Sequence, residues 1–299
     1  MQFSIYQESR RGARRTNQDR IAYCYSKDAL LMLVADGMGG HLHGEVAAQI
    51  AVQFITQAFR REAVPALPDP GLFLRRTITG AHHAIIAHAA EAGLTEVPRT
   101  TCVACVAQAD NACWAHAGDS RLYHIRDGRI LAQTKDHSLV QQLIDQGRIR
   151  EEAYAAHPER NRIFNCLGSA RLPQVDVSQP VRLHAGDTLI LCSDGLWGPL
   201  SSKKIAGALL KSGIMQAVPE LLDEAEQRAG RACDNLSVIA LTWEQDSAAA
   251  RPEPAATRNA PPREPGAADA QQGYLSDDEI ERAIANIRNA IRRDQDGKT

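Results

Sequence analysis

Hydrophobic and polar residues alternate along the chain in two patterns. Short apolar runs bounded by turn residues, the pattern of buried strands, lie at 31–35, 100–108, 112–117, 120–126, 129–134, 181–184, 187–193 and 235–243. Apolar residues at helical spacing predict helices at 44–62, 71–92, 138–146, 201–212 and 214–229. Strands, two helices, strands, two helices and a last strand favour an α+β fold, a sheet sandwich covered by helices on both outer faces.

The composition changes near the end of the chain. Residues 1–246 carry all of these predicted elements and are expected to form one folded domain. Residues 247–273 are rich in alanine and proline, which predicts an extended linker. Residues 274–299 hold one short amphipathic helix, with acids in its first turn and Ile280, Ile284, Ile287 and Ile291 on one face.

Charge and hydropathy exclude several classes of protein. The chain has 299 residues, of which 44% are hydrophobic and 23% charged, as in ordinary globular proteins. A net charge of −2 predicts no attraction to nucleic acid or to an anionic membrane. No apolar segment approaches the roughly 18 residues of a membrane span, and residues 1–10 lack the pattern of a signal peptide. We therefore expect a cytoplasmic protein.

The seven cysteines are scattered, mostly inside apolar runs, which predicts reduced and buried thiols. Cys102 and Cys105 form a C-x-x-C pair, the spacing found in zinc and redox sites. They lie in a predicted strand, however, where residues three apart face opposite sides. We interpret both as core residues.

Four predicted strands have an aspartate at one end. Asp36, Asp119 and Asp194 each follow an apolar run, and Asp234 precedes one. In an antiparallel sheet the end of one strand lies beside the start of its neighbour, so these carboxylates can converge. One Asp-Gly pair alone is more often a hairpin turn. Four gathered acids repel each other unless cations neutralise them, and hard divalent ions with oxygen ligands do so best. The pattern predicts a metal centre.

The residues around these acids form a series of motifs in a characteristic order. They are Arg14-Arg15-Thr16-Asn17-Gln18-Asp19, Asp36-Gly37-Met38-Gly39-Gly40-His41, Gly118-Asp119-Ser120, Asp136-His137-Ser138, Ser193-Asp194-Gly195 and Asp234-Asn235. In this series the chain resembles the metal-dependent serine/threonine protein phosphatases of the type 2C family, in its bacterial branch. The resemblance covers roughly residues 3–243.

The resemblance implies a four-layer α-β-β-α sandwich, in which two antiparallel sheets are flanked by helix pairs and the active site lies at one end. Asp36 would bridge two Mn²⁺ or Mg²⁺ ions, and the carbonyl of Gly37 would bind one of them. Asp194 and Asp234 would bind the other ion, and Asp119 together with Asp194 matches a third metal site. Gln18 and Asp19 would hold metal-bound water, with Asn235 beside them.

The implied reaction is hydrolysis of phosphoserine and phosphothreonine by a metal-bridged hydroxide. Arg14, five residues before Asp19, is at the family position of an arginine that grips phosphate, and a guanidinium can hold two phosphate oxygens at once. The alternative for Arg14 is a solvated basic patch with Arg10, Arg11 and Arg15.

The proton donor to the leaving group is less defined. Met38 stands where eukaryotic members have a histidine, and it cannot donate a proton. His41 is the candidate catalytic residue, and a structural role at the start of the following helix is the alternative. Residues 148–172 match the family's flap segment, which lies beside the active site and helps to select the substrate.

The implied partners are phosphorylated proteins, in particular a bacterial serine/threonine kinase and its targets. A pseudophosphatase would be expected to lack Asp36, Asp194 or Asp234, and the chain has all three. The alternative function is a phosphatase-fold regulatory or scaffold module that recruits a partner through its C-terminal helix.

Overall fold

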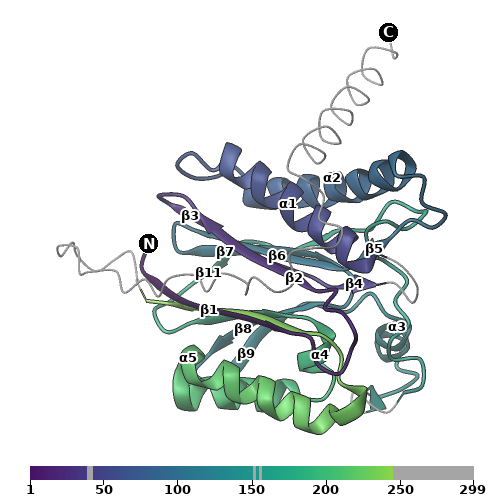
Figure 1. The fold of residues 1–299 in the computed structure, drawn as a ribbon. Helices are drawn as coiled ribbons and strands as arrows, with labels where there is room; N and C mark the ends of the chain where they lie inside the picture. Colours follow the sequence, from purple (N-terminus) through teal and green to yellow (C-terminus); the bar gives the residue numbers. More distant parts are fainter. Residues whose placement is uncertain (39–42, 151–152, 155–156, 245–299) are drawn as a thin grey trace.

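The computed structural model describes residues 1–38, 43–150, 153–154 and 157–244 (Figure 1). The first half contains β1 Phe3–Arg10, β2 Arg20–Tyr25, β3 Ala29–Ala35, β4 Gly37–Met38, α1 Gly44–Glu62, α2 Pro70–Glu91, β5 Arg99–Thr100, β6 Cys102–Gln108, β7 Asn111–Ala117, β8 Arg121–Arg126 and β9 Arg129–Gln133. The second half contains α3 Leu139–Asp145, β10 Asp176–Val177, β11 Val181–Arg182, β12 Thr188–Cys192, α4 Asp194–Trp197, α5 Ser202–Ala229 and β13 Leu236–Trp243. The predicted linker and C-terminal helix lie outside the described residues, as does His41.

Two antiparallel sheets stack on each other. One has five strands in the order β1-β13-β12-β8-β9, and the other has the order β10-β7-β6-β3-β2, with β11 also paired to β7. Helices α1 and α2 cover the outer face of the six-stranded sheet, and α5 covers the outer face of the other (Figure 1). At Gly213 the backbone turns to φ 66° and divides α5 into two segments, which match the two predicted helices. The predicted α+β sandwich is confirmed.

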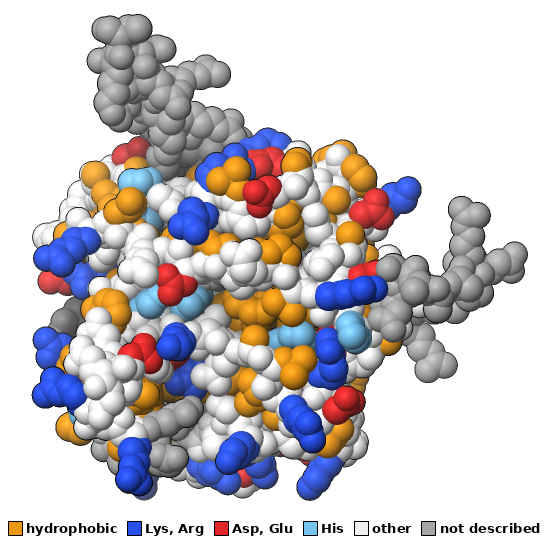
Figure 2. Space-filling view, turned by 180° about the vertical axis from the view of Figure 1, so that it is seen from behind, with side chains coloured by type: hydrophobic (Ala, Val, Ile, Leu, Met, Phe, Trp, Pro, Cys, Tyr) orange, Lys and Arg blue, Asp and Glu red, His pale blue; other side chains and the backbone are white. Residues whose placement is uncertain are grey.

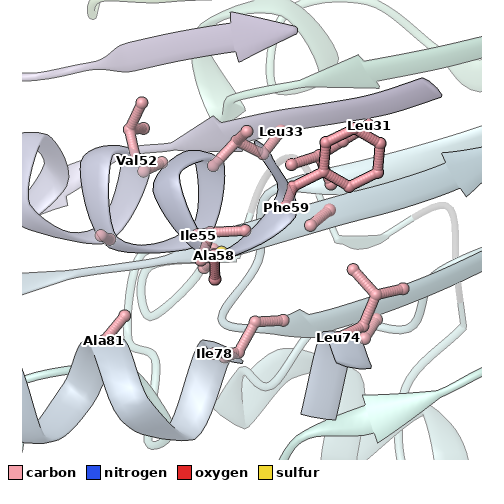
Figure 3. Packing of buried hydrophobic residues seen from close by; sticks show 14 of the residues in the cluster. Leu31, Leu33, Val52, Ile55, Ala58, Phe59, Leu74, Ile78 and Ala81 are labelled. Atoms are coloured by element: carbon pink, nitrogen blue, oxygen red, sulfur yellow. The ribbon is translucent and has the colours of Figure 1, made fainter. Parts of the chain in front are cut away.

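Alternating side chains of the central strands fill the spaces between the layers. Leu31 and Leu33 of β3 point to the helical layer, where Ile55 and Phe59 of α1 meet them (Figure 3). The intervening residues of β3, Leu30, Met32 and Val34, pack instead between the two sheets, against residues of β12 and β13 such as Leu189 and Leu241. This two-sided burial explains why β3 is apolar throughout rather than alternating with polar residues.

The C-x-x-C pair obeys the same alternation. Cys102 packs under the helices, whereas Cys105 packs between the sheets. Both thiols are free and buried, and burial raises the pKa of Cys102 to about 12. The interpretation of this pair as core residues is confirmed.

Helix α5 has an apolar face that packs against the five-stranded sheet inside the domain. Among the described residues, Ser202–Ala232 is a stretch whose length and hydropathy would also suit a membrane span, which is weak evidence for one. Its Ile205, Leu209, Leu221 and Leu222 are buried in one cluster with residues of β12 and β13. The face of the molecule seen in Figure 2 carries basic, acidic and hydrophobic side chains interspersed with one another, with some hydrophobic ones grouped near the middle.

Strands β1 and β2 are not among the predicted strands. They form one edge of each sheet, and their residues are mostly half-buried, with polar side chains mixed among the apolar ones. An edge strand with one partner buries less surface than a central strand, so its hydrophobic pattern is weaker.

The strand order brings the acidic strand ends to one end of the sandwich. β3 and β7 both run antiparallel to β6, so the C-terminal ends of β3 and β7 lie at the same end of their sheet. In the other sheet, β12 ends where its antiparallel partner β13 begins, with Cys192 opposite Val238. The carboxylate-bearing end is the one at which β4, β5 and α4 lie, on the right in Figure 1.

Candidate metal centre

Five aspartates meet at this end, and we call them the carboxylate cluster: Asp19, Asp36, Asp119, Asp194 and Asp234. Asp19 and Asp119 are buried, with exposed fractions of 2% and 6%. The other three are half-buried, so ions from solvent can reach them. Asp19 directly precedes β2, and the other four lie at the strand ends that the sequence singles out.

The backbone of Asp36 is fixed by the strand end that faces it. Its N–H donates to the hydroxyl of Thr101 at 3.1 Å, and its carbonyl accepts from the Thr101 N–H at 2.8 Å and from the Thr100 hydroxyl at 2.9 Å. The Thr101 hydroxyl is 2.7 Å from that of Ser120, next to Asp119. One threonine pair thus links the turns that carry two of the acids. Sequence reasoning did not identify these threonines.

The glycines after the acids allow backbone segments to touch. A Cβ on Gly37 would lie 2.3 Å from the Gly44 carbonyl oxygen and 2.7 Å from that of Gln18. A Cβ on Gly195 would lie 2.1 Å from the carbonyl oxygen of Asn235. Because these contacts are backbone to backbone, a side chain at either position would push the acid-bearing segments apart. The role of the Gly37 carbonyl as a metal ligand stays a prediction.

Asn235 fastens the loop that carries Arg14 and Gln18. Its side-chain oxygen accepts from the Gln18 N–H at 2.8 Å, and its amide nitrogen donates to the carbonyls of Arg11 at 2.8 Å and Thr16 at 3.0 Å. The resemblance places Asn235 beside metal-bound water, but the structure commits its amide to the loop backbone. Asn235 therefore supports the site by holding residues 11–18 in place.

Asp19 is held on one oxygen only. Its Oδ2 accepts from the Ser193 hydroxyl at 2.7 Å, whereas its buried Oδ1 has no hydrogen-bond donor among the described residues. Burial, with the charge of Asp234 adding to it, raises the pKa of Asp19 from 3.8 to about 6. A buried carboxylate oxygen without a donor fits a place where a cation or its bound water belongs.

Asp36, Asp119 and Asp194 show the same conflict between burial and charge. Burial and the neighbouring carboxylates, Asp19 first among them, raise the pKa of Asp36 well above its ordinary value. The pKa of Asp194 is raised in the same way, by burial and then by Asp119. Burial, followed by the charge of Asp136, raises the pKa of Asp119 to about 7. The cluster can be fully ionised near neutral pH only with added positive charge, and its all-oxygen donors suit Mn²⁺ or Mg²⁺.

Arg14 contributes positive charge to the cluster. Its guanidinium lies 2.6 Å from Oδ2 of Asp234, and this hydrogen bond is the main reason that the pKa of Arg14 is raised. The predicted phosphate-gripping residue therefore contacts a predicted metal ligand. Arg10 pairs instead with Glu8, Asp223 and Glu226, which argues against a shared basic patch with Arg14.

The Gln18 side chain donates to Glu45 at 3.1 Å, in the first turn of α1. Glu45 is a further carboxylate next to the site that sequence reasoning missed. It directly follows Gly44, the residue that packs on Gly37. His41, the predicted proton donor, lies outside the described residues.

A buried ion pair supports the turn around Asp119. Arg121 binds Asp136 through two hydrogen bonds of 2.8 and 2.7 Å, and its guanidinium lies 3.7 Å from the ring centre of Trp197. The Tyr154 hydroxyl donates to Asp136 at 2.7 Å. These groups neutralise one another's charges and fill one another's hydrogen bonds beneath the carboxylate cluster. Replacing Arg121 or Asp136 would leave a buried charge unpaired.

His116, His137 and Asp176 form a second group whose ligand atoms lie within 4.8 Å of one another. Nδ1 of His137 accepts from the Gly118 N–H at 3.1 Å and faces the Asn165 amide nitrogen at 2.6 Å. The opposite ring nitrogen must then carry the proton, and it donates to Asp176 at 3.2 Å. His137 has no free lone pair for an ion. The group instead ties Asn165, in the predicted flap segment, to the turn before Asp119.

Similarity to known proteins identifies the class to which this chain belongs. The family model of Protein phosphatase 2C matches residues 7–231, and the chain belongs to this family. The serine/threonine phosphatase stp of Listeria monocytogenes is 31% identical over 229 residues, which cover 76% of this chain and 90% of that protein.

A second relative is the serine/threonine protein phosphatase PstP of Mycobacterium tuberculosis, 33% identical over 233 residues. The match covers 77% of this chain but only 43% of PstP, so the chain spans less than half of that relative. The crystal structure of the PstP catalytic domain in complex with two manganese ions superposes with a TM-score of 0.69 and 30% identity, over 81% of this chain and 99% of that one.

The hydrogen bonds by which Asn235 holds residues 11–18 in place can be tested directly. In Asn235→Ala, the Gln18 N–H and the carbonyls of Arg11 and Thr16 lose their partner, so we expect destabilisation by about 1–3 kcal/mol. Hydrogen exchange should accelerate at the amides of residues 11–18 while those of β3 stay protected. Asn111→Ala, which removes an exposed bond to Ala109, is the matched control. Unchanged exchange in the loop would show that other contacts hold it.

The raised pKa values predict how stability depends on pH in a chelator. At pH 6.5, the ordinary pKa of His82 and His116, each histidine is half protonated when unfolded, whereas burial lowers its pKa in the folded state. Above this pH the two unfolded histidines release about half a proton each, which opposes the effect of the aspartates only in part. Asp119 and the more strongly shifted Asp36 and Asp194 still hold protons when folded but not when unfolded. Stability should therefore fall as pH rises from 6.5 to about 8.

Thermal unfolding in chelator at these two pH values measures the slope, and added Mn²⁺ should abolish it. Asp119→Asn, which removes one titrating group, should make the slope shallower. A melting temperature that rises with pH in chelator would contradict the electrostatic description of the cluster.

Proposed function

We propose that this protein hydrolyses phosphoserine and phosphothreonine on other proteins in a metal-dependent reaction. One observation carries the proposal: five carboxylates from both sheets gather at one end of the sandwich, and burial together with mutual repulsion raises the pKa values of four of them, Asp19, Asp36, Asp119 and Asp194. In a chain of the protein phosphatase 2C family, such a cluster is best explained as a site for divalent ions.

The residues have distinct roles in this proposal. Asp36, the Gly37 carbonyl, Asp194 and Asp234 would hold two Mn²⁺ or Mg²⁺ ions, with Asp119 and Asp194 available to a third. When bound, such ions supply Lewis-acid activation of water and neutralise charge on the phosphate. The protein's own contribution is to fix the ligands through backbone bonds such as those from Thr101 and to keep their geometry rigid.

Further groups act on water and substrate. Asp19 has a free buried oxygen to accept a hydrogen bond from water, and Gln18 can orient one. Arg14 is exposed enough to reach a phosphate, with 58% of its side chain accessible. His41 stays the sequence-based candidate for donating the proton to the leaving serine or threonine oxygen.

The substrates are phosphorylated proteins, and we place the reaction in the cytoplasm opposite a serine/threonine kinase. Exposed Phe164 and Leu172 lie in the flap segment, where they could contact residues that flank the phosphorylated one. Residues 247–273 and 274–299 stay predictions as a linker and a helix, and a partner protein for that helix is part of the proposal.

The decisive assay is hydrolysis of a phosphothreonine peptide. We expect no turnover after chelation and recovery with Mn²⁺. Asp36→Asn and Asp194→Asn should each lower kcat by about 10³-fold or more, because each removes charge from a group that positions the ions. Asp145→Asn, a change to an exposed acid on α3 that pairs with Lys135, is the control and should keep full activity. Full activity in metal-free protein would contradict the proposal.

A further inference from the structure

Arg14 forms an ion pair with the carboxylate of Asp234, which the proposed function assigns to a metal ion as a ligand. Its guanidinium is 2.6 Å from Oδ2 of Asp234, and the charges of Asp194 and Asp36 also favour the arginine at this place. A guanidinium and a divalent ion on one carboxylate repel each other. Each should therefore weaken the binding of the other, by the reciprocity that governs two ligands of a shared group.

The backbone around Arg14 is fixed on both sides. Asn235 holds the carbonyls of Arg11 and Thr16, and the Ala13 N–H donates to the Cys233 carbonyl at 3.1 Å. Any change of partner by Arg14 must then come from its flexible side chain and not from movement of the loop. The side chain is free to do so, since more than half of it is exposed.

We propose that Arg14 is a positioning residue that competes with a divalent ion for Asp234 and is released towards the phosphate group when that ion binds. This inference rests on the proposed function, because it needs Asp234 to be a metal ligand. It gives Arg14 two alternating partners, a carboxylate and a phosphate, which share the planar arrangement of two oxygens that a guanidinium recognises.

Competition between Arg14 and the ion predicts the direction in which metal affinity changes when Arg14 is removed. If Arg14 only gripped phosphate, its removal would leave metal binding unchanged. If it competes, its removal tightens metal binding. Exposed ion pairs are weak, so we expect the dissociation constant for Mn²⁺ in Arg14→Ala to fall by about two- to fivefold. The binding of inorganic phosphate in the presence of Mn²⁺ should weaken in the same variant.

Calorimetric titration of the full chain with Mn²⁺ tests the inference without using activity. Arg15→Ala is the matched control, because it removes the same charge one residue away and Arg15 has no ion pair with the cluster among the described contacts. We expect tighter Mn²⁺ binding in Arg14→Ala and unchanged binding in Arg15→Ala.

Equal or weaker Mn²⁺ binding in Arg14→Ala would overturn the inference, and so would an equal gain in both variants, which would show a long-range charge effect. If the unaltered protein bound no Mn²⁺, the proposed function itself would fail. Failure of the proposed function can thus be told apart from failure of the inference, since it is seen in the unaltered protein and does not depend on any variant.

Discussion

Repulsion among buried carboxylates is the constraint on which the rest of this structure depends. Five aspartates are brought to one end of the sandwich by the ends of strands that are mostly buried, of which β3 is apolar throughout. The hydrophobic cores on both sides of each sheet fix these strands, so the acids cannot move apart to relieve the repulsion. The fold therefore stores an unfavourable electrostatic arrangement that cations can relieve, which is what a metal centre requires.

Hydrogen bonds and close backbone contacts keep the acids in place. Asn235 fastens the N-terminal loop, Ser193 holds Asp19, and Thr101 holds the backbone of Asp36. The glycines at 37 and 195 let segments from different strands approach to distances that no side chain would allow. Around the cluster, most polar groups thus serve to position the few that can meet ions or substrate.

The sequence predicted much of this arrangement, because its strongest signals are local. Apolar runs next to an aspartate are readable from the chain, and antiparallel pairing then allows the aspartates at the strand ends to converge. The edge strands β1 and β2 were missed because half-buried residues carry a weaker pattern. The partners of Arg14 and Asn235 were not predictable, since both lie more than 200 positions away along the chain in at least one contact.

Locating bound Mn²⁺ by anomalous diffraction from crystals of the protein tests the central claim most directly. The account predicts at least two ions between Asp36, Asp194 and Asp234, with Arg14 no longer on Asp234. Manganese found only elsewhere, for example at His116, His137 and Asp176, or not at all at millimolar concentrations, would contradict it.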